Sequence, residues 1–275
     1  MKIGGTTRVT GLFGFPVEHS LSPAMHNAAF EYLSLDFCYV TFLVHPTLLA
    51  DAVKSIQALD LGGVNVTVPH KERVIPFLDA VDDEASFIGA VNTIKSAGGK
   101  LTGYNTDGRG FMESLTEAGI EVQGKTVLIV GAGGASRAIS YYLSERASHL
   151  WIYDIDANRA GRLVADLGTI RANVGRQHTV ENLKDVDVLI NATPLGLKDG
   201  DQTPVSTSVL KQGMVVCDLI YKKTPLLEAA SKKGCKTLDG LGMLLHQGVL
   251  AFEIWTGIKP PIDIMRNAIA GFRRS

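Results

Sequence analysis

A glycine-rich turn between two apolar runs is the first feature of this sequence that could do chemistry. The stretch 125–156 opens with an apolar run, turns through Gly131, Gly133 and Gly134, and continues as a helix-length segment. Glycines let a dinucleotide pyrophosphate approach the backbone, and free N–H groups at a helix start bind its charge. A second apolar run ends on Asp154, whose carboxylate could accept hydrogen bonds from a ribose. The order predicts a dinucleotide-binding domain, with a glycine-rich turn that binds nothing as the alternative.

Polar side chains also stand where two other expected strands end. Ser20 and Ser22 follow an apolar run, and Pro23 after Ser22 is typical of a helix start. In a later strand, valines alternate with Asn65 and Thr67, so both polar side chains point to one face. Ligands of open α/β sheets bind at the carboxyl ends of strands. Taken alone, each residue is more often a helix cap or a loop group with its hydrogen bonds made.

Lys71 and Asp107 are charged residues at expected helix starts. Pro69 stops the preceding strand, and Lys71 then falls at the beginning of a helix, where the helix dipole disfavours a cation. That placement hints at a role other than helix stability. Asp107 precedes a helix expected over residues 109–118 and could simply cap it. The boundary between two domains is expected close to Asp107.

The apolar periodicity of the remaining chain predicts alternating strands and helices. Strands are expected over residues 8–13, 37–44, 90–95, 100–104, 214–221 and 235–238, and another ends at residues 191–194. Helices are expected over residues 46–59, 157–167 and 225–233, followed by two C-terminal helices broken at residues 259–261. This pattern indicates an α/β protein, with a sheet of five or six strands in the part that holds the glycine turn.

Composition limits the classes of function. With 275 residues, of which 45% are apolar, the chain suits two domains with sizeable cores. A net charge of −1 and the lack of a basic cluster disfavour binding to nucleic acid or acidic membranes. Cys38, Cys217 and Cys235 form no CxxC pair, so we expect reduced thiols, no metal site and a cytoplasmic location. We expect neither a signal peptide nor a membrane span.

Seven short motifs taken together resemble the shikimate dehydrogenase family. They are HSLSP, NVTVPHK, AVNT, NTDG, GAGGAS, NAT and DGLGM with Gln247, and they cover nearly the whole chain. The resemblance implies an open α/β substrate (catalytic) domain, residues 1–106 plus 240–275, to which the C-terminal helices return. It implies a Rossmann-like, doubly wound dinucleotide-binding domain over residues 107–239, and an active site in a cleft that hinge movement can close.

The activity implied by this resemblance is reversible hydride transfer between shikimate and 3-dehydroshikimate with NAD or NADP, a step of chorismate and aromatic amino acid biosynthesis. By position, the resemblance assigns the catalytic roles to Lys71 and Asp107. A base must take the hydroxyl proton in oxidation, and an acid must supply it in reduction. The sequence leaves open whether Lys71, Asp107 or both carry that proton.

The resemblance also assigns the residues that hold substrate and cofactor. The substrate carboxylate is assigned to Ser20 and Ser22, and the ring hydroxyls to Asn65, Thr67, Asn92, Asp107 and Gln247, with Tyr221 lining the same site. The cofactor is assigned to Gly131, Ala132, Gly133, Gly134, Ala135, Asp154, Asp156, Arg159, Asn191, Thr193, Leu219, Gly240 and Met243.

The chain departs from the family pattern after the second strand of the nucleotide segment. Members that use NADP typically have Asn, Arg and Thr there, and this chain has Asp154, Ile155 and Asp156. A carboxylate suits the ribose hydroxyls of NAD and repels the 2′-phosphate of NADP. We therefore expect a preference for NAD, with Arg159 or Arg162 as residues that could restore NADP binding.

Other functions are kept as alternatives. An NAD-dependent quinate/shikimate dehydrogenase of quinate catabolism is the nearest one, and the presence of both Ser20 and Ser22 favours shikimate over quinate. A sensor without activity is disfavoured because Lys71 and Asp107 are both retained. A methylene-tetrahydrofolate or amino-acid dehydrogenase has no reason to carry HSLSP with NTDG. The expected partner is a small molecule, in a monomer or a homodimer.

Overall fold

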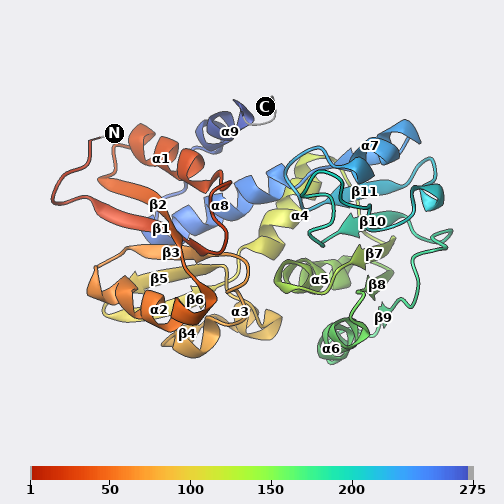
Figure 1. The fold of residues 1–275 in the computed structure, drawn as a ribbon, viewed down its shortest axis with the longest axis horizontal. Coiled ribbons are helices and arrows are strands. Elements are labelled where there is room, and N and C mark those ends of the chain that lie inside the picture. Colours follow the sequence, from red (N-terminus) through yellow and green to blue (C-terminus); the bar gives the residue numbers. More distant parts are fainter. Residues whose placement is uncertain (1, 272–275) are drawn as a thin grey trace. The chain divides into compact units, whose positions relative to one another are not determined.

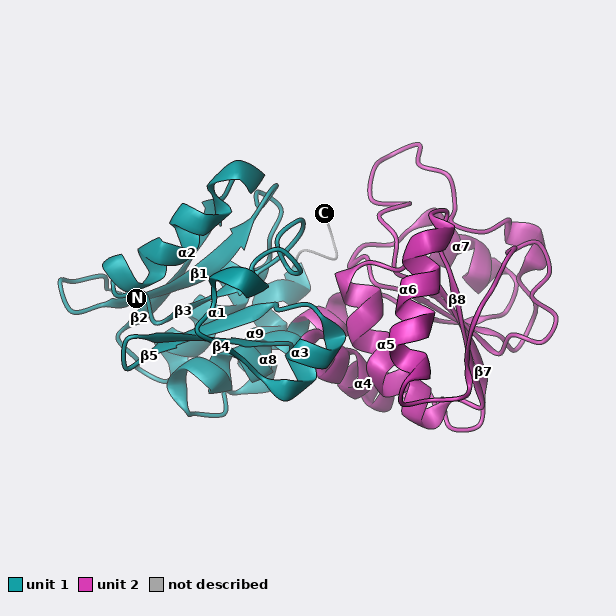
Figure 2. Cartoon of the chain, turned by 90° about the horizontal axis from the view of Figure 1, so that it is seen from below, with its two compact units in different colours: residues 1–106, 245–275 teal, residues 107–244 magenta. Residues whose placement is uncertain are grey.

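The computed structural model describes residues 2–271, and the chain divides into two compact units. The first unit contains residues 1–106 and 245–275, and the second contains residues 107–244 (Figure 2). Each unit is built on its own six-stranded sheet (Figure 1). The expected α/β class is confirmed, since helices and strands alternate along the chain in both units.

The sheet of the first unit has the order β2-β1-β3-β5-β6-β4. Its strands are β1 (Arg8–Gly14), β2 (Phe37–Leu43), β3 (Gly63–Val66), β4 (Ala80–Val81), β5 (Thr93–Ala97) and β6 (Lys100–Tyr104). Strand β1 pairs in parallel with both β2 and β3, whereas β5 is antiparallel to β3 and β6. Because the chain places β2 on one side of β1 and β3 on the other, the carboxyl ends of β1 and β3 flank a topological switch point.

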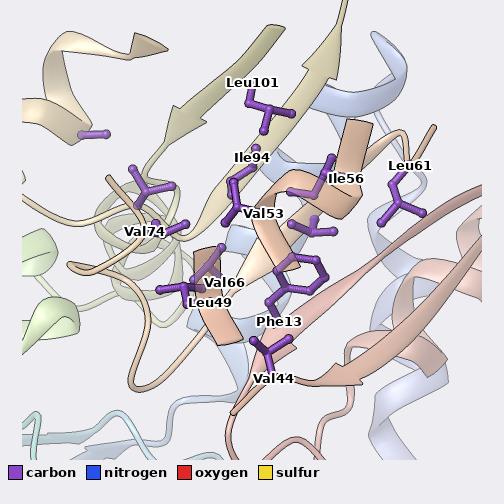
Figure 3. Close-up of a cluster of buried hydrophobic side chains, with 13 residues drawn as sticks. Phe13, Val44, Leu49, Val53, Ile56, Leu61, Val66, Val74, Ile94 and Leu101 are labelled. Atoms are coloured by element: carbon purple, nitrogen blue, oxygen red, sulfur yellow. The ribbon is translucent and has the colours of Figure 1, made fainter. Parts of the chain in front are cut away.

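One face of this sheet is covered by α2 (Leu49–Ala58), which follows the 3₁₀ turn η1 (Pro46–Leu48). Leu49, Val53 and Ile56 recur at helical spacing and pack with Phe13 and Val66 in an apolar cluster (Figure 3). Full burial of each such side chain contributes about 1.5–3 kcal/mol to the free energy of folding. The cluster fixes one face of the sheet without any polar group.

The other face is covered by α1 (Ser22–Tyr32) and α8 (Leu241–Thr256), and α9 (Ile262–Ala270) packs on α1. Here the fully buried imidazole of His26 stacks on Tyr39 of β2, with ring centroids 4.5 Å apart. The rings of Phe252 and Trp255 of α8 lie 6.2 and 5.3 Å from His26. Neither ring nitrogen of His26 has a hydrogen-bond partner among the described residues. His26 therefore serves as a flat packing group.

The segment after β3 differs from the expected helix. The chain makes turns from residue 68 to residue 74, where the Val74 N–H donates to the His70 carbonyl, and then the 3₁₀ turn η2 (Ile75–Phe77). A helix running through this segment would lose a hydrogen bond at Pro76, which has no N–H, and its ring would clash with the preceding turn. Lys71 consequently lies in a turn, and the argument from the helix dipole does not apply to it.

The second unit has an all-parallel sheet in the order β12-β11-β10-β7-β8-β9. Its strands are β7 (Thr126–Val130), β8 (His149–Tyr153), β9 (Val174–Arg176), β10 (Val188–Asn191), β11 (Val215–Asp218) and β12 (Lys236–Leu238). Numbered within the unit, this order is 6-5-4-1-2-3, the arrangement of the doubly wound dinucleotide-binding fold. The switch point lies between β7 and β10, so the glycine turn after β7 and the chain after β10 share one edge of the sheet.

The helices of this unit follow the apolar periodicity. They are α4 (Asp107–Glu117), α5 (Gly134–Arg146), α6 (Ala157–Gly168) and α7 (Pro225–Lys232), with the 3₁₀ turn η3 (Thr207–Val209). Strand β11 ends at Asp218, three residues before the expected end at Tyr221. The expected strand over residues 90–95 also begins later, at Thr93, and the short helix α3 (Asp83–Ile88) was not expected.

Within residues 2–271, the helices fall short of the length and apolarity that crossing a bilayer requires.

The burial of His26 predicts a change in acid stability. Burial lowers the pKa of His26 from 6.5 to about 3. Below pH 6.5 His26 is protonated in the unfolded chain but stays neutral in the folded chain. The free energy of unfolding therefore falls as the pH falls, by up to about 1.4 kcal/mol per pH unit. The free energy of unfolding of His26→Leu, measured in urea, should therefore rise relative to that of the wild type as the pH is lowered from 7 to 4. Parallel curves of unfolding free energy against pH would contradict the assignment.

Candidate active site

Asn65 is the polar centre of the first unit. It is 5% exposed and stands in β3, whose other residues are all buried. Its Nδ2 donates to the Asn92 carbonyl oxygen at 3.1 Å and to Thr93 Oγ1 at 3.0 Å, and its Oδ1 accepts from the Tyr39 hydroxyl at 2.9 Å. All of these partners are buried. The amide is thus held in one orientation by groups on β2, on β5 and in the segment before β5.

Asn92 extends this hydrogen-bond network to Thr106, at the end of the first unit's N-terminal segment. Its Oδ1 accepts from Thr93 Oγ1 at 3.0 Å and from the Thr106 N–H at 2.9 Å, and its Nδ2 donates to Thr106 Oγ1 at 2.9 Å. Asn105 is anchored separately, through Nδ2 to the Ala90 carbonyl at 2.8 Å. The motifs AVNT and NTDG are therefore hydrogen-bonded to each other, and Asp107, 4% exposed, follows directly as the first residue of α4.

The two serines of HSLSP lie at the start of α1. The N-cap residue is Leu21, and no side chain caps this helix, so Ser22 does not act as the cap that its place before Pro23 suggests. The Ser22 N–H donates to Ser20 Oγ at 3.3 Å. Burial raises the pKa of Tyr39, and a side-chain hydrogen bond with Ser22 acts in the opposite direction. The structure thus links Ser22 to Asn65 through Tyr39.

The remaining residues assigned to the substrate differ in burial. Thr67 and Lys71 are partly exposed, and Gln247 in α8 is 8% exposed. The carbonyl of Lys71 accepts from the Val91 N–H at 2.8 Å, which holds Lys71 beside the segment that carries Asn92. Tyr221, in the second unit, lies in the loop after β11 and is 36% exposed.

In the second unit, the glycine turn has the geometry of a phosphate cradle. Gly131 has φ +108°, and a Cβ at this position would come within 2.8 Å of the Ala192 carbonyl oxygen. Gly133 is the N-cap residue of α5, and no side chain caps that helix. The N–H groups of the first helical turn, which begins with Gly134 and Ala135, have no intrahelical acceptors. An anion is the group that such a helix start binds.

The two carboxylates after β8 accept hydrogen bonds from backbone N–H groups. Asp154 Oδ2 accepts from the Ala132 N–H at 2.7 Å, and its Oδ1 accepts from the Asp156 N–H at 2.8 Å. Asp156 Oδ1 caps α6 by accepting from the N–H groups of Asn158 and Arg159, at 2.9 and 3.3 Å. Asp154 therefore ties the turn after β8 to the glycine turn, and Asp156 starts a helix.

Arg159 extends from the first turn of α6 over the glycine turn. Its Nη2 lies 3.5 Å from the point where a Cβ of Gly133 would stand. The side chain is exposed, so the guanidinium is open to an anion bound at this edge. The glycine turn, the start of α5 and the Arg159 guanidinium therefore lie close together, and backbone N–H groups and a guanidinium are groups that can bind phosphate.

Asn191 and Asp218 close the neighbouring strand ends. Asn191 Nδ2 donates to Asp218 Oδ1 at 3.0 Å, and its Oδ1 accepts from the N–H and hydroxyl of Thr193 at 3.0 and 2.7 Å. Asp218, 1% exposed, also accepts from the Ile220 N–H and the Thr224 hydroxyl. Burial raises the pKa of this carboxyl. These hydrogen bonds turn the chain away from the strand direction after Asp218, so β11 ends before the expected Tyr221.

Gly240 is a position where only glycine can stand. A Cβ there would collide with the backbone carbonyl of Leu219, and the Gly240 N–H donates to the Ile220 carbonyl at 3.1 Å. Met243, 7% exposed, lies one helical turn further on in α8. Leu219 and Gly240 are thereby brought together at the end of β11.

The sequence argument missed Tyr39, Thr93, Thr106 and Asp218. Asp218 could have been found, because a lone carboxylate in the apolar run from Met214 to Ile220 needs buried partners. Tyr39, in contrast, gives no signal in a strand of apolar and aromatic residues. Within the described residues, His, Cys, Asp and Glu form no group of three or more that could hold a metal ion.

Comparison with known proteins gives consistent matches over the whole chain. Residues 12–94 match the family model "Shikimate dehydrogenase substrate binding domain", and residues 240–270 match "Shikimate 5'-dehydrogenase C-terminal domain". The chain is 48% identical to the shikimate dehydrogenase (NADP(+)) of Desulforamulus reducens, over 98% of this chain and 96% of that protein.

Solved structures agree with these matches. The shikimate dehydrogenase of Aquifex aeolicus is 42% identical with a TM-score of 0.93, over 98% of this chain and 99% of that one. A shikimate dehydrogenase in complex with NADP+ is 41% identical with a TM-score of 0.92, over 98% of this chain and 97% of that one.

The expected preference for NAD is wrong. The relatives carry NADP(+) in their names, and one of the similar structures holds NADP+. The physical reason is that Asp154 and Asp156 direct their carboxylates to backbone N–H groups of the turn and of α6. Arg159, which the sequence argument named as a residue that could restore NADP binding, has its guanidinium beside the glycine turn.

The bonds of Asp154 predict the effect of removing its carboxylate. Asp154→Ala leaves the N–H groups of Ala132 and Asp156 without these acceptors and should raise the KM for NADP by up to about thirtyfold, because each of the two lost hydrogen bonds costs about 1 kcal/mol. Asp185→Ala, at an exposed position of the same unit, is the control. An Asp154→Ala enzyme with improved kcat/KM for NADP would show that the carboxylate repels the cofactor instead.

Proposed function

This chain belongs to the shikimate dehydrogenase family, and we propose that it oxidises shikimate to 3-dehydroshikimate with NADP+ and catalyses the reverse reduction with NADPH. It is an oxidoreductase of the doubly wound, dinucleotide-binding type. The observation that carries the proposal is the buried network from Asn65 through Thr93 and Asn92 to Thr106. Neutral amides and hydroxyls at a sheet switch point are the groups that a small polyhydroxylated acid requires.

We assign the substrate to the residues that the family pattern singles out. Ser20 and Ser22 would bind its carboxylate, and Asn65, Thr67 and Asn92 would bind its ring hydroxyls, together with Asp107 and Gln247. Burial of Asn65 and Asn92 supports this assignment, because buried amides with fixed orientations discriminate among hydroxyl patterns. Tyr221 would line the same site.

Lys71 and Asp107 are proposed to handle the proton. When the hydroxyl-bearing ring carbon loses its hydride, the hydroxyl proton must go to a base, and in the reverse direction the same group returns it to the carbonyl oxygen. Lys71 and Asp107 are the two ionisable side chains that the family pattern places at this step. Lys71 and Asp107 would between them take up or return one proton per turnover.

NADP+ would be held by the second unit and would accept the hydride at its nicotinamide ring. The Gly131–Gly133 turn and the start of α5 suit the pyrophosphate, with Gly134 and Ala135 contributing backbone N–H groups next to Ala132. Arg159 would bind the 2′-phosphate by charge-assisted hydrogen bonds. Asn191, Thr193, Leu219, Gly240 and Met243 would border the cofactor at the ends of β10 and β11 and in α8.

We also propose a cytoplasmic enzyme that acts as a monomer or a homodimer. The buried, free thiols of Cys38, Cys217 and Cys235 support a reducing compartment, since reduced cysteines persist there.

Steady-state kinetics with shikimate and quinate test the proposed activity. The wild type should oxidise shikimate with NADP+ at a higher kcat/KM than quinate, and Lys71→Ala should lose at least about a hundredfold in kcat, the usual contribution of an acid–base group. Lys54→Ala, at an exposed position of the same unit, should behave as the wild type. Quinate turnover equal to or above that of shikimate would overturn the substrate assignment.

A pair of arginine variants tests the cofactor assignment. Arg159→Ala should raise the KM for NADP+ by about tenfold to a hundredfold, because a hydrogen bond to a charged group is worth about 1.5–3 kcal/mol. Its kcat/KM with NAD+ should stay within about twofold of the wild type, since NAD+ lacks the 2′-phosphate. Arg162→Ala, exposed and one helical turn away, is the matched control. A loss of NADP+ affinity in Arg162→Ala alone would move the phosphate to that residue.

A further inference from the structure

Tyr39 is a residue of the first unit to which the family pattern gives no role. Its burial and its hydrogen bond to Asn65 make it a candidate for one. It is 1% exposed and lies on β2, the edge strand of the sheet. The register pairs Tyr39 with Thr10 and Asn65 with Leu12, two residues further along β1. Both side chains therefore point to the same face of the sheet. The Tyr39 side chain crosses β1 on that face, and its hydroxyl reaches Asn65 Oδ1 at 2.9 Å.

The direction of each hydrogen bond around Asn65 is determined by its partners. The Asn92 carbonyl can only accept, so the group of Asn65 that faces it must be the amide Nδ2. The opposite group, Oδ1, can only accept, so Tyr39 must donate its single hydroxyl proton to it.

Residues of two helices, α1 and α8, hold Tyr39 in this position. Its backbone N–H donates to Asn27 Oδ1 at 2.7 Å, and its carbonyl accepts from Asn27 Nδ2 at 2.9 Å, which ties β2 to α1. Its ring stacks on His26 with centroids 4.5 Å apart, and Trp255 of α8 lies 6.0 Å away. Because the ring is fixed by packing and the backbone by Asn27, the hydroxyl position does not depend on Asn65.

We propose that Tyr39 is a positioning residue for the substrate, which orients the amide of Asn65. This inference rests on the proposed function, in which Asn65 binds the substrate. Without the phenol, Asn65 Oδ1 loses its donor inside a buried site, and the amide is free to turn toward other partners. The ring packing of Tyr39 against His26 is unaffected by removing the oxygen.

Tyr39→Phe tests this role, because it removes the hydroxyl and keeps the ring. The variant should raise the KM for shikimate about fivefold to tenfold and leave kcat and the KM for NADP+ within about twofold, since it weakens ground-state and transition-state binding alike. Tyr32→Phe, the same change at a 63% exposed position of α1, is the matched control and should match the wild type. Thermal unfolding of both variants checks that the comparison is made on folded protein.

A double-mutant cycle with Asn65→Ala separates positioning from general loosening of the fold. If Tyr39 acts mainly through Asn65, Tyr39→Phe should change the KM for shikimate by less than about twofold in the Asn65→Ala background. An unchanged KM in the single variant, equal effects on shikimate and NADP+, or full additivity in the cycle would overturn the inference. A wild type that does not oxidise shikimate would instead remove the proposed function, so the two failures are distinguishable.

Discussion

The central constraint on this structure is that an amide inside a buried strand must have all its hydrogen bonds made. Asn65 stands in β3 with apolar neighbours before and after it, and a buried polar group without partners costs several kcal/mol. The fold meets this requirement with groups from two places in the sequence, Tyr39 and the adjacent residues Asn92 and Thr93. A site for a hydroxylated acid can be built on this base because the groups that face it are already oriented.

In the second unit, buried polar side chains at the ends of β10 and β11 must likewise have their hydrogen bonds made. Asn191 and Asp218 are both buried at the ends of their strands, and the Asn191 amide donates a hydrogen bond to the Asp218 carboxylate. Their hydrogen bonds to Thr193, Ile220 and Thr224 set the path of the loops that border the switch point. The apolar clusters on the faces of both sheets supply stability, and these polar clusters at the strand ends determine which ligands the loops can bind.

Features that follow from local chemistry could be predicted from the sequence. The strand, glycine turn and helix around Gly131 were predictable because a positive φ and a close backbone contact leave few alternatives. The helix expected at Lys71 was not formed, since Pro76 interrupts it. The cofactor preference was wrong because the partners of Asp154 depend on how the turn after β8 meets the glycine turn. Tyr39 could not be predicted either, because its bond to Asn65 joins strands that are not neighbours in the sheet.

Calorimetric titration of shikimate into the full chain tests most directly whether the oriented polar groups form a shikimate site. The titration should be made with NADPH present, because the reduced cofactor cannot accept a hydride and no turnover follows. We predict saturable binding with one site per chain and weaker binding of quinate under the same conditions. A folded protein that binds shikimate neither with NADPH nor without it would contradict the assignment of the Asn65 network to the substrate.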